Sequence, residues 1–136
     1  MPGGGSLNPS SPETIKKRMH YVHQDGKNVF RFAVRGMADV SQEMLDRHNL
    51  TGQDLKLYVP HQANLRIIRA AVEKMHLAES QVAINIDRYA NTTAATIPIC
   101  LSEASETKRI TKNDLIMLAS FGAGFTWGSL LLRWEI

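Results

Sequence analysis

Short apolar runs of strand type alternate along this chain with longer segments whose apolar residues recur every three or four positions. The strand-type runs are residues 55–59, 82–86, 114–120 and 126–134, and the helix-type segments are residues 28–49, residues 63–75 and the one that carries Ile97, Leu101 and Ala104. Alternating strands and helices are typical of α/β layers built around a sheet. The last two runs are too close in sequence for a crossover helix, so we expect an antiparallel pair and a mixed sheet.

The two longest helical segments each have one apolar face. In residues 63–75, at about 100° per residue, one face holds Ile67, Ile68, Ala71, Val72 and Met75, and the opposite face holds Arg66, Arg69 and Glu73. The stripe in residues 28–49 consists of Val29, Ala33, Met37, Val40 and Met44. We expect both helices to pack on the sheet through these faces. Asn91, Thr92 and Thr93 are expected to cap the third helix.

Size and composition describe one ordinary globular domain. A chain of 136 residues with 43% hydrophobic and 21% charged residues is long enough to bury a single core. The formal net charge of +3 is too small and scattered to indicate nucleic-acid binding. One cysteine excludes an internal disulfide, and no apolar run is long enough for a membrane span, so we expect a cytoplasmic protein.

The beginning of the chain differs from the rest in composition. The stretch MPGGGSLNPSSP holds three of the nine glycines and three of the five prolines. Gly and Pro suit neither helix nor strand interiors. We therefore divide the chain into a loop-rich linker or edge segment, residues 1–27, and one domain, residues 28–136.

Polar loops follow three of the predicted strands. Pro60 is expected to end the first strand directly before His61, Asn91 follows the second, and the turn FGAG at 121–124 follows the third. Loops beyond the carboxyl ends of strands are where α/β folds bind ligands. His and Asn side chains can donate hydrogen bonds to a developing oxyanion, and glycine-rich backbone can add an N–H. These loops therefore predict half of an acyl-transfer site.

A thiol hydrolase is an alternative that the residues leave open. Cys100 is the single thiol, and with His61 and Asn91 it would form the Cys-His-Asn set of some thiol proteases. Cys100 follows Pro98 among the apolar residues of a predicted helix, where an inert buried thiol is the more common case. A reactive thiolate needs a helix N-terminus or a cationic neighbour.

Three ordered motifs, VPHQANLRII, NIDRYANTTAATIP and FGAGFTWGSLLLRW, resemble the C-terminal half of the β-ketoacyl-acyl-carrier-protein synthase III family. The resemblance implies a thiolase-like fold, in which two similar halves stack their helices between two five-stranded mixed sheets. This chain would be one half, and the acylated cysteine would belong to the absent N-terminal half. We therefore expect the chain alone to be inactive. The complete enzyme would condense an acyl-coenzyme A primer with malonyl-acyl carrier protein, with decarboxylation, to start type II fatty acid synthesis.

The same resemblance implies roles for particular residues. His61 and Asn91 would be catalytic and would bind the malonyl thioester carbonyl. Phe121 would be an active-site wall, and the backbone N–H of Ala123 would join the oxyanion hole. The substrate contacts implied by the resemblance are Gly26, Phe30, Ala63 and Asn64 for coenzyme A or pantetheine, and Arg66 and Arg69 for acyl carrier protein. No metal and no cofactor besides the thioester substrates is implied.

The partners implied by the resemblance are acyl carrier protein, coenzyme A thioesters, the N-terminal half and a second copy in a homodimer. Nucleic acid and membranes are not implied. Plant-type polyketide synthases are similar at the histidine, the asparagine and the glycine turn, so a related polyketide-type condensing enzyme is one alternative. A non-catalytic module for carrier-protein binding or dimerisation is another, if the chain exists alone.

Overall fold

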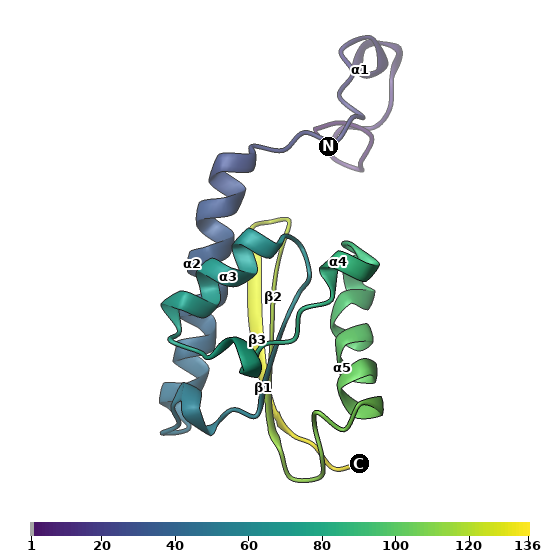
Figure 1. The fold of residues 1–136 in the computed structure, drawn as a ribbon. Helices are drawn as coiled ribbons and strands as arrows, with labels where there is room; N and C mark the ends of the chain where they lie inside the picture. The colour runs from purple at the N-terminus through teal and green to yellow at the C-terminus, as the bar shows by residue number, and fades with distance from the viewer. Residues whose placement is uncertain (1) are drawn as a thin grey trace.

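The computed structural model describes residues 2–136 and contains one sheet with helices on both faces (Figure 1). The α-helices and strands are, in chain order, α1 Pro12–Lys16, α2 Gly26–Arg47, β1 Leu57–Pro60, α3 Leu65–Lys74, α4 Ile86–Tyr89, α5 Thr96–Glu106, β2 Leu115–Gly122 and β3 Thr126–Arg133. The strands lie side by side in the order β1-β2-β3. Helices α2 and α3 cover one face of the sheet and α5 covers the other, which confirms the predicted α/β layers.

The hydrophobic core lies on both faces of β1. Successive residues of a strand point to opposite faces. Tyr58 accordingly packs with Met37 of α2 in one buried cluster, whereas Leu57 and Val59 pack with Cys100 of α5 in a second. All four residues of β1 are buried. This strand is therefore the element around which both helical layers are built.

Helix α3 uses the face that its sequence predicts. Ile67, Ile68 and Ala71 are buried, whereas Arg66 and Arg69 are exposed. The apolar face lies against the cluster that contains α2 and the sheet. The two arginines are therefore on the solvent side, as the helical period requires.

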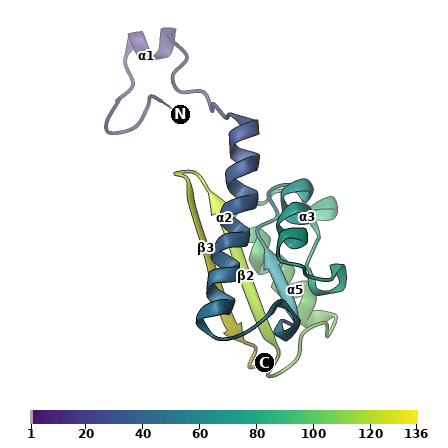
Figure 2. The ribbon, with the colours of Figure 1, turned by 90° about the vertical axis from the view of Figure 1, so that its left-hand side faces the viewer.

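Helix α2 begins at Gly26, two residues earlier than expected. Asp25 caps it, because its carboxylate accepts a hydrogen bond of 3.1 Å from the backbone N–H of Asn28. The boundary that we expected after residue 27 therefore falls inside the first turn of this helix. Residues 2–21 project away from the body of the protein and include the short helix α1 (Figure 2).

Strand β1 pairs in parallel with β2 and extends one residue further than expected. Pro60 lies opposite Ala119, and the N–H of His61 donates to the oxygen of Ala119 at 2.8 Å. The strand therefore ends directly before His61, as predicted, but Pro60 does not end the pairing, because one more hydrogen bond to β2 follows it. Alternate residues of a strand direct their N–H and C=O groups to opposite sides. Tyr58 uses its oxygen on the side away from β2, where it accepts from Ala83. Pro60 lies two residues after Tyr58, so its backbone groups also face away from β2. The N–H that proline lacks would therefore not have bonded to β2.

Residues 82–86, which we expected to form a strand, make a single bridge to β1 instead. Val82 bridges Tyr58 in parallel, and the chain enters helix α4 at Ile86. The sheet of the described residues consequently has three strands. The five strands implied by the resemblance are not formed within residues 2–136.

The side chain of Gln62 explains why the segment does not continue as a strand. Gln62 is fully buried, and its Nε2 donates to the oxygen of Ala83 at 3.1 Å. Its Oε1 accepts from the N–H of Asn85, also at 3.1 Å. A backbone group that is buried must find a partner. Because one side-chain amide satisfies both of these groups, no neighbouring strand is needed beyond Val82.

The loop after α4 does not cap α5 directly. Asn91 Oδ1 accepts a hydrogen bond of 3.0 Å from the N–H of Thr93 and so begins a 3₁₀ turn, Thr93–Ala95. Helix α5 then starts at Thr96, with Ala95 as an N-cap that offers no side-chain hydrogen bond. The expected capping of α5 by the Asn-Thr-Thr stretch is therefore wrong: Thr92 is the N-cap of the short turn and makes no side-chain capping bond, and Asn91 bonds only the N–H two residues further on.

The antiparallel pairing of β2 and β3 is confirmed, with Phe121 opposite Trp127. The indole of Trp127 lies against the backbone of α2 at Gly36, where an added Cβ would come within 2.9 Å of Trp127 Cδ2. Glycine inside a helix costs about 1 kcal/mol relative to alanine. The close approach of the indole accounts for a glycine at this position.

Replacing Gly36 by Ala is expected to lower the free energy of unfolding by about 1–3 kcal/mol, because overpacking against a rigid ring outweighs the gain in helix propensity. Urea unfolding measures the change. Gly26→Ala is the matched control in the same helix, since nothing lies within 4 Å of a Cβ built there. A Gly36→Ala protein as stable as the wild type would show that the indole does not constrain α2.

Candidate active site

A cavity of about 860 Å³ opens where the carboxyl ends of β1 and β2 meet the first turns of α2 and α3. Its walls come from four separate parts of the chain: residues 22–37, residues 61–67, Asn91, and residues 121–125. The site residues predicted from the sequence that line this cavity are Gly26, Phe30, His61, Ala63, Asn64, Arg66, Asn91, Phe121 and Ala123. Arg69 does not line it. The three polar loops that follow predicted strands thus meet at one cavity.

His61 is held at the cavity by its backbone and by its ring. Its N–H continues the β1–β2 ladder, and its Nδ1 lies 2.6 Å from the hydroxyl oxygen of Thr96 in the first turn of α5. The side chain is half-buried, and this desolvation lowers the pKa of His61 below its ordinary value of 6.5. The ring is therefore neutral at neutral pH, with Nε2 as the nitrogen left for a ligand.

Asn91 is oriented by its own loop. Because its Oδ1 is the acceptor for the N–H of Thr93, the Nδ2 group is the part of the amide that can donate to a ligand. Asn91 is exposed and lies on the wall of the cavity. The cavity therefore combines an imidazole and an amide donor from two different loops.

The turn between β2 and β3 supplies an aromatic wall. Phe121 is half-buried, and its ring centroid lies 5.1 Å from that of Phe125 and 6.2 Å from that of Trp127. Ala123 is exposed at the cavity, and its oxygen accepts from the hydroxyl of Thr126 at 3.1 Å. These contacts fix the turn beside the histidine and the asparagine.

The first turns of α2 and α3 form the opposite wall. Asn64 is the N-cap of α3 and accepts from the N–H of Arg66 at 2.9 Å. The guanidinium of Arg66 lies over the ring of Phe30 in α2, 5.4 Å from its centroid, which is a cation-π contact between the helices. Arg66 therefore borders the cavity, whereas Arg69 continues the basic face one turn further along α3.

Several cavity residues were missed by sequence reasoning. Val29, Ala33 and Ile67 line the cavity, although the helical period marked them only as members of apolar faces. The period reports which side of a helix avoids water, but it does not tell a packed core from the wall of a cavity. For Thr96, which contacts His61 across 35 positions, the sequence carries no signal.

Cys100 does not take part in this site. It is 3% exposed in the cluster between α5 and the sheet, and it does not line the cavity that holds His61 and Asn91. Burial raises the pKa of its thiol to about 11, so the thiolate is disfavoured at neutral pH. The inert explanation of this cysteine is therefore supported, and the arrangement of a thiol hydrolase is not formed.

Two other kinds of site were sought among residues 2–136. No three His, Cys, Asp or Glu side chains in this part of the chain come together so that they could hold a metal ion. None of its helices combines the length and the apolar character that crossing a membrane requires.

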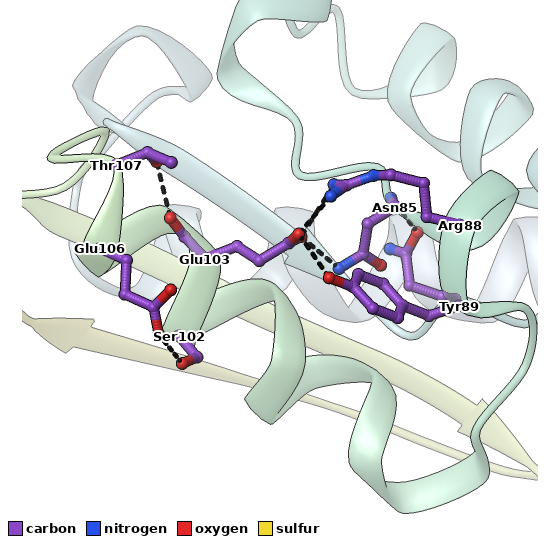
Figure 3. Close-up of polar contacts among 8 residues, drawn as sticks. Asn85, Arg88, Tyr89, Ser102, Glu103, Glu106 and Thr107 are labelled. Carbon is purple, nitrogen blue, oxygen red and sulfur yellow. Dashed lines mark hydrogen bonds and ion pairs between the residues drawn. The ribbon is translucent and has the colours of Figure 1, made fainter.

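Glu103 of α5 fixes the short helix that precedes Asn91 (Figure 3). Its carboxylate accepts from Asn85 Nδ2 at 2.7 Å, from Arg88 Nη2 at 3.0 Å and from the hydroxyl of Tyr89 at 3.1 Å. The next residue, Ala90, has a positive φ of 58°, a backbone state that needs support from its surroundings. The three hydrogen bonds therefore hold the turn from which Asn91 reaches the cavity.

Solved structures of known enzymes share this fold. The β-ketoacyl-acyl-carrier-protein synthase III of Thermus thermophilus is similar over 83% of this chain and 35% of its own, with a TM-score of 0.80 and 48% identity. The 3-oxoacyl-acyl-carrier-protein synthase III of Aquifex aeolicus VF5 is similar over 84% of this chain and 37% of its own, with a TM-score of 0.81 and 41% identity. These similarities confirm the thiolase-like fold.

The sequence comparisons agree with the fold. Residues 45–134 match the family model described as 3-oxoacyl-[acyl-carrier-protein (ACP)] synthase III C terminal. The β-ketoacyl-acyl-carrier-protein synthase III of Chlorobaculum tepidum is 53% identical over 135 residues, which are 99% of this chain and 41% of the relative. The chain therefore belongs to the family of C-terminal parts of 3-oxoacyl-acyl-carrier-protein synthase III, and it spans less than half of that relative's length.

Replacing Glu103 by Gln is expected to lower the urea midpoint of unfolding at pH 7. The hydrogen bond from Asn85, and then the contact with Arg88, lowers the pKa of Glu103 below its ordinary value of 4.5. A lowered carboxyl pKa stabilises the folded state above pH 4.5, and this contribution is lost as the pH falls through the folded-state pKa. The difference between variant and wild type should therefore shrink in acid.

Glu106→Gln is the matched control, because Glu106 lies on the same helix and accepts a hydrogen bond from the hydroxyl of Ser102 at 2.9 Å. Its urea midpoint should differ little from the wild type at either pH. A Glu103→Gln midpoint that stays equally low in acid would show that the carboxylate charge is not what holds this turn.

Proposed function

We propose that this chain forms the C-terminal half of a 3-oxoacyl-acyl-carrier-protein synthase III, which condenses an acyl-coenzyme A primer with malonyl-acyl carrier protein. The observation that carries the proposal is the meeting of His61, Asn91 and the 121–125 turn at one cavity. Membership of the C-terminal family supports it. The nucleophilic cysteine would come from the N-terminal half, so the 136-residue chain alone is expected to form no acyl-enzyme.

In the decarboxylation step, the malonyl thioester loses carbon dioxide. The electron pair of the broken carbon–carbon bond moves into an enolate, whose negative charge lies on the thioester oxygen. His61 Nε2 and Asn91 Nδ2 would donate hydrogen bonds to that oxygen. Donors fixed before the reaction stabilise such charge without reorganisation, and loss of one costs about 10²- to 10³-fold in rate.

In the condensation step, the enolate carbon attacks the acyl carbon held on the cysteine. A carbon–carbon bond forms, the carbon–sulfur bond breaks, and the cysteine leaves as a thiolate. The backbone N–H of Ala123 would stabilise the oxyanion of the acyl group in this step. Phe121 would exclude water from the thioester, because its half-buried ring stands at the cavity.

The wall formed by α2 and α3 suits the arm that delivers the malonyl group. Gly26 leaves the start of α2 without a side chain, and Phe30, Ala63 and Asn64 line the cavity beyond it. A pantetheine chain is long, thin and mixed in polarity, which matches such a wall. Arg66 at the border of the cavity and Arg69 outside it would meet the acidic surface of acyl carrier protein.

The complete enzyme is further proposed to act in the cytoplasm as a homodimer. Strand β3 lies at the edge of the sheet, and Trp127 and Leu130 on it are 49% and 50% exposed. Large exposed apolar side chains on an edge strand favour contact with another part of an assembly. Sedimentation of the complete enzyme as a single copy would contradict the dimer.

Replacing His61 or Asn91 by Ala in a complete enzyme is expected to reduce malonyl decarboxylation by about 10²- to 10³-fold while acetyl transfer to the cysteine remains measurable. The reason is that the charge they bind arises only on the enolate. Single-turnover assays of each half-reaction separate the two effects. The double variant should lose much less than the product of the single losses, because both donors serve one oxygen.

Cys100→Ala is the control for these assays, since that thiol is buried outside the cavity and both half-reactions should continue. If His61→Ala stops acetyl transfer as completely as decarboxylation, the histidine acts mainly as a base for the thiol. The assignment of His61 to the malonyl step would then be wrong.

Replacing Arg66 and Arg69 together by Glu is expected to raise the KM for malonyl-acyl carrier protein by roughly three- to tenfold and to leave acyl-coenzyme A transfer nearly unchanged. Only the carrier protein presents an acidic surface to α3. Steady-state kinetics with each substrate measure this. The paired change of Lys108 and Lys112 to Glu reverses the same charge at exposed positions away from the cavity and should have little effect. Equal losses with both substrates would contradict a carrier-protein contact.

A further inference from the structure

The side chain of Gln62 is fully buried beside the cavity without lining it, although the residues on either side of it in the sequence do line it. Its Nε2 donates to the backbone oxygen of Pro60 at 2.8 Å and to that of Ala83 at 3.1 Å. Its Oε1 accepts from the N–H of Asn85 at 3.1 Å. One amide therefore joins the end of β1 to the segment that precedes α4.

The chemistry of these partners fixes the orientation of the amide. A backbone oxygen can only accept a hydrogen bond, and a backbone N–H can only donate one. The Nε2 of Gln62 must therefore face the two oxygens, and its Oε1 must face the N–H of Asn85. An amide turned by half a circle would lose all of these hydrogen bonds. The side chain is consequently held in a single arrangement.

The contacts of Gln62 stand where a parallel ladder would otherwise continue. The N–H of Ala83 donates to the oxygen of Tyr58 at 2.9 Å, as in a regular parallel pair. The next two hydrogen bonds of such a ladder would join the N–H of residue 60 to the oxygen of Ala83, and the N–H of Asn85 to the oxygen of residue 60. Pro60 has no N–H, so the first of them cannot form. The Nε2 of Gln62 supplies the missing donor.

The same amide replaces the second of these hydrogen bonds. It accepts from Asn85 on one side and donates to Pro60 on the other, so it stands between two backbone groups that would otherwise bond directly. Two groups that are joined through an amide lie further apart than two that bond to each other. The length of the glutamine amide therefore sets the separation of the two segments at this point.

Each of the two segments leads to one of the candidate donors. His61 follows Pro60 directly in the sequence. Asn85 is the N-cap of α4, and the chain leaves this helix to reach Asn91. The Nδ2 of Asn85 also donates to Glu103 at 2.7 Å, which ties the start of α4 to α5. A change in the separation at Gln62 would therefore change the distance between the two donors.

We propose that Gln62 is a positioning residue whose amide is a spacer of fixed length between the loop that carries His61 and the segment that leads to Asn91. The catalytic consequence rests on the proposed function, in which both side chains donate to one enolate oxygen. Two donors reach one oxygen only at a suitable separation, and a misplacement of about 1 Å can cost roughly 10²-fold in rate. Gln62 acts through the donors and does not touch the substrate.

The spacer is tested first without substrate, in crystal structures of the complete enzyme. In the wild type, the amide is expected to separate the oxygen of Pro60 from the N–H of Asn85. A direct hydrogen bond between these two groups would overturn the proposal, and this result needs no variant to fold. Gln62→Met keeps the length of the side chain and removes its hydrogen-bonding groups. The distance between the Cα atoms of His61 and Asn91 is expected to change in this variant, and an unchanged distance would also overturn the proposal.

Single-turnover decarboxylation then shows whether Gln62 acts through the two donors. Gln62→Met is expected to lower the rate roughly 10- to 100-fold in the otherwise wild-type enzyme. The loss should be much smaller in an Asn91→Ala background, because no second donor remains there to be aligned. A residue that only supports the fold would lower the rate by the same factor in both backgrounds, and that result would overturn the proposal.

Gln81→Met is the matched control, because Gln81 makes the same set of contacts ahead of the first residue of β1. Its Nε2 donates to the oxygens of Gly52 at 2.9 Å and Leu55 at 2.7 Å, and its Oε1 accepts from the N–H of Ala78 at 3.1 Å. Gln81 does not line the cavity. Its replacement should lower the urea midpoint of unfolding and leave decarboxylation unchanged. A loss of decarboxylation as large as that of Gln62→Met would trace both effects to lost stability and would overturn the proposal.

The proposed function and the role of Gln62 can fail separately. If Asn91→Ala decarboxylates malonyl-acyl carrier protein at the normal rate, the proposed function fails, whatever the crystal structure of Gln62→Met shows. If Asn91→Ala is impaired and Gln62→Met decarboxylates at the normal rate, the role of Gln62 fails and the proposed function stands.

Discussion

The parallel pairing of β1 with β2 is the constraint on which the site depends. Parallel strands bring their carboxyl ends to the same edge of a sheet, so the residues that follow β1 and β2 become neighbours although they are far apart in sequence. The hydrogen bond from the N–H of His61 to Ala119 is the last rung of this ladder. After this hydrogen bond, the chain leaves β1 and leads to α3, whereas β2 continues to the turn that carries Ala123. The parts of the cavity wall formed by residues 61–67 and 121–125 both follow from this one register.

Two polar side chains, the buried Gln62 and the partly exposed Glu103, provide hydrogen bonds that the short strands do not. Gln62 satisfies backbone groups of residues 83 and 85, and Glu103 binds three side chains around α4. Both act on the segment that ends at Asn91. Helix α5 has a further part in this arrangement, because Thr96 in its first turn contacts His61 and Glu103, two turns later, supports α4. One helix therefore sets the positions of both candidate donors, from outside the cavity.

Local patterns predicted the elements that are stabilised locally. The period of α3 and the closeness of β2 and β3 each depend on residues within one segment, and both were confirmed. The strand expected at residues 82–86 was wrong because the partner of its backbone is a side chain, Gln62, about twenty positions away. The candidate site residues followed from resemblance and, for His61 and Asn91, also from their place after predicted strands; all but Arg69 gather at one cavity. The contact between Thr96 and His61 was not predictable, since neither helical nor strand period relates the two positions.

The order of the strands along the chain also affects how the protein folds. Leu57 of β1 pairs with Ile116 of β2, so β1 has no partner within the sheet until every helix from α1 to α5 has been synthesised. The β2–β3 hairpin, in contrast, closes over a turn of three residues, 123–125. Contacts of large separation form slowly, because the loop between them must be closed first. During synthesis the largely apolar strand β1 therefore stays unpaired on its β2 side until β2 follows, and unpaired strand edges of this kind are prone to aggregate.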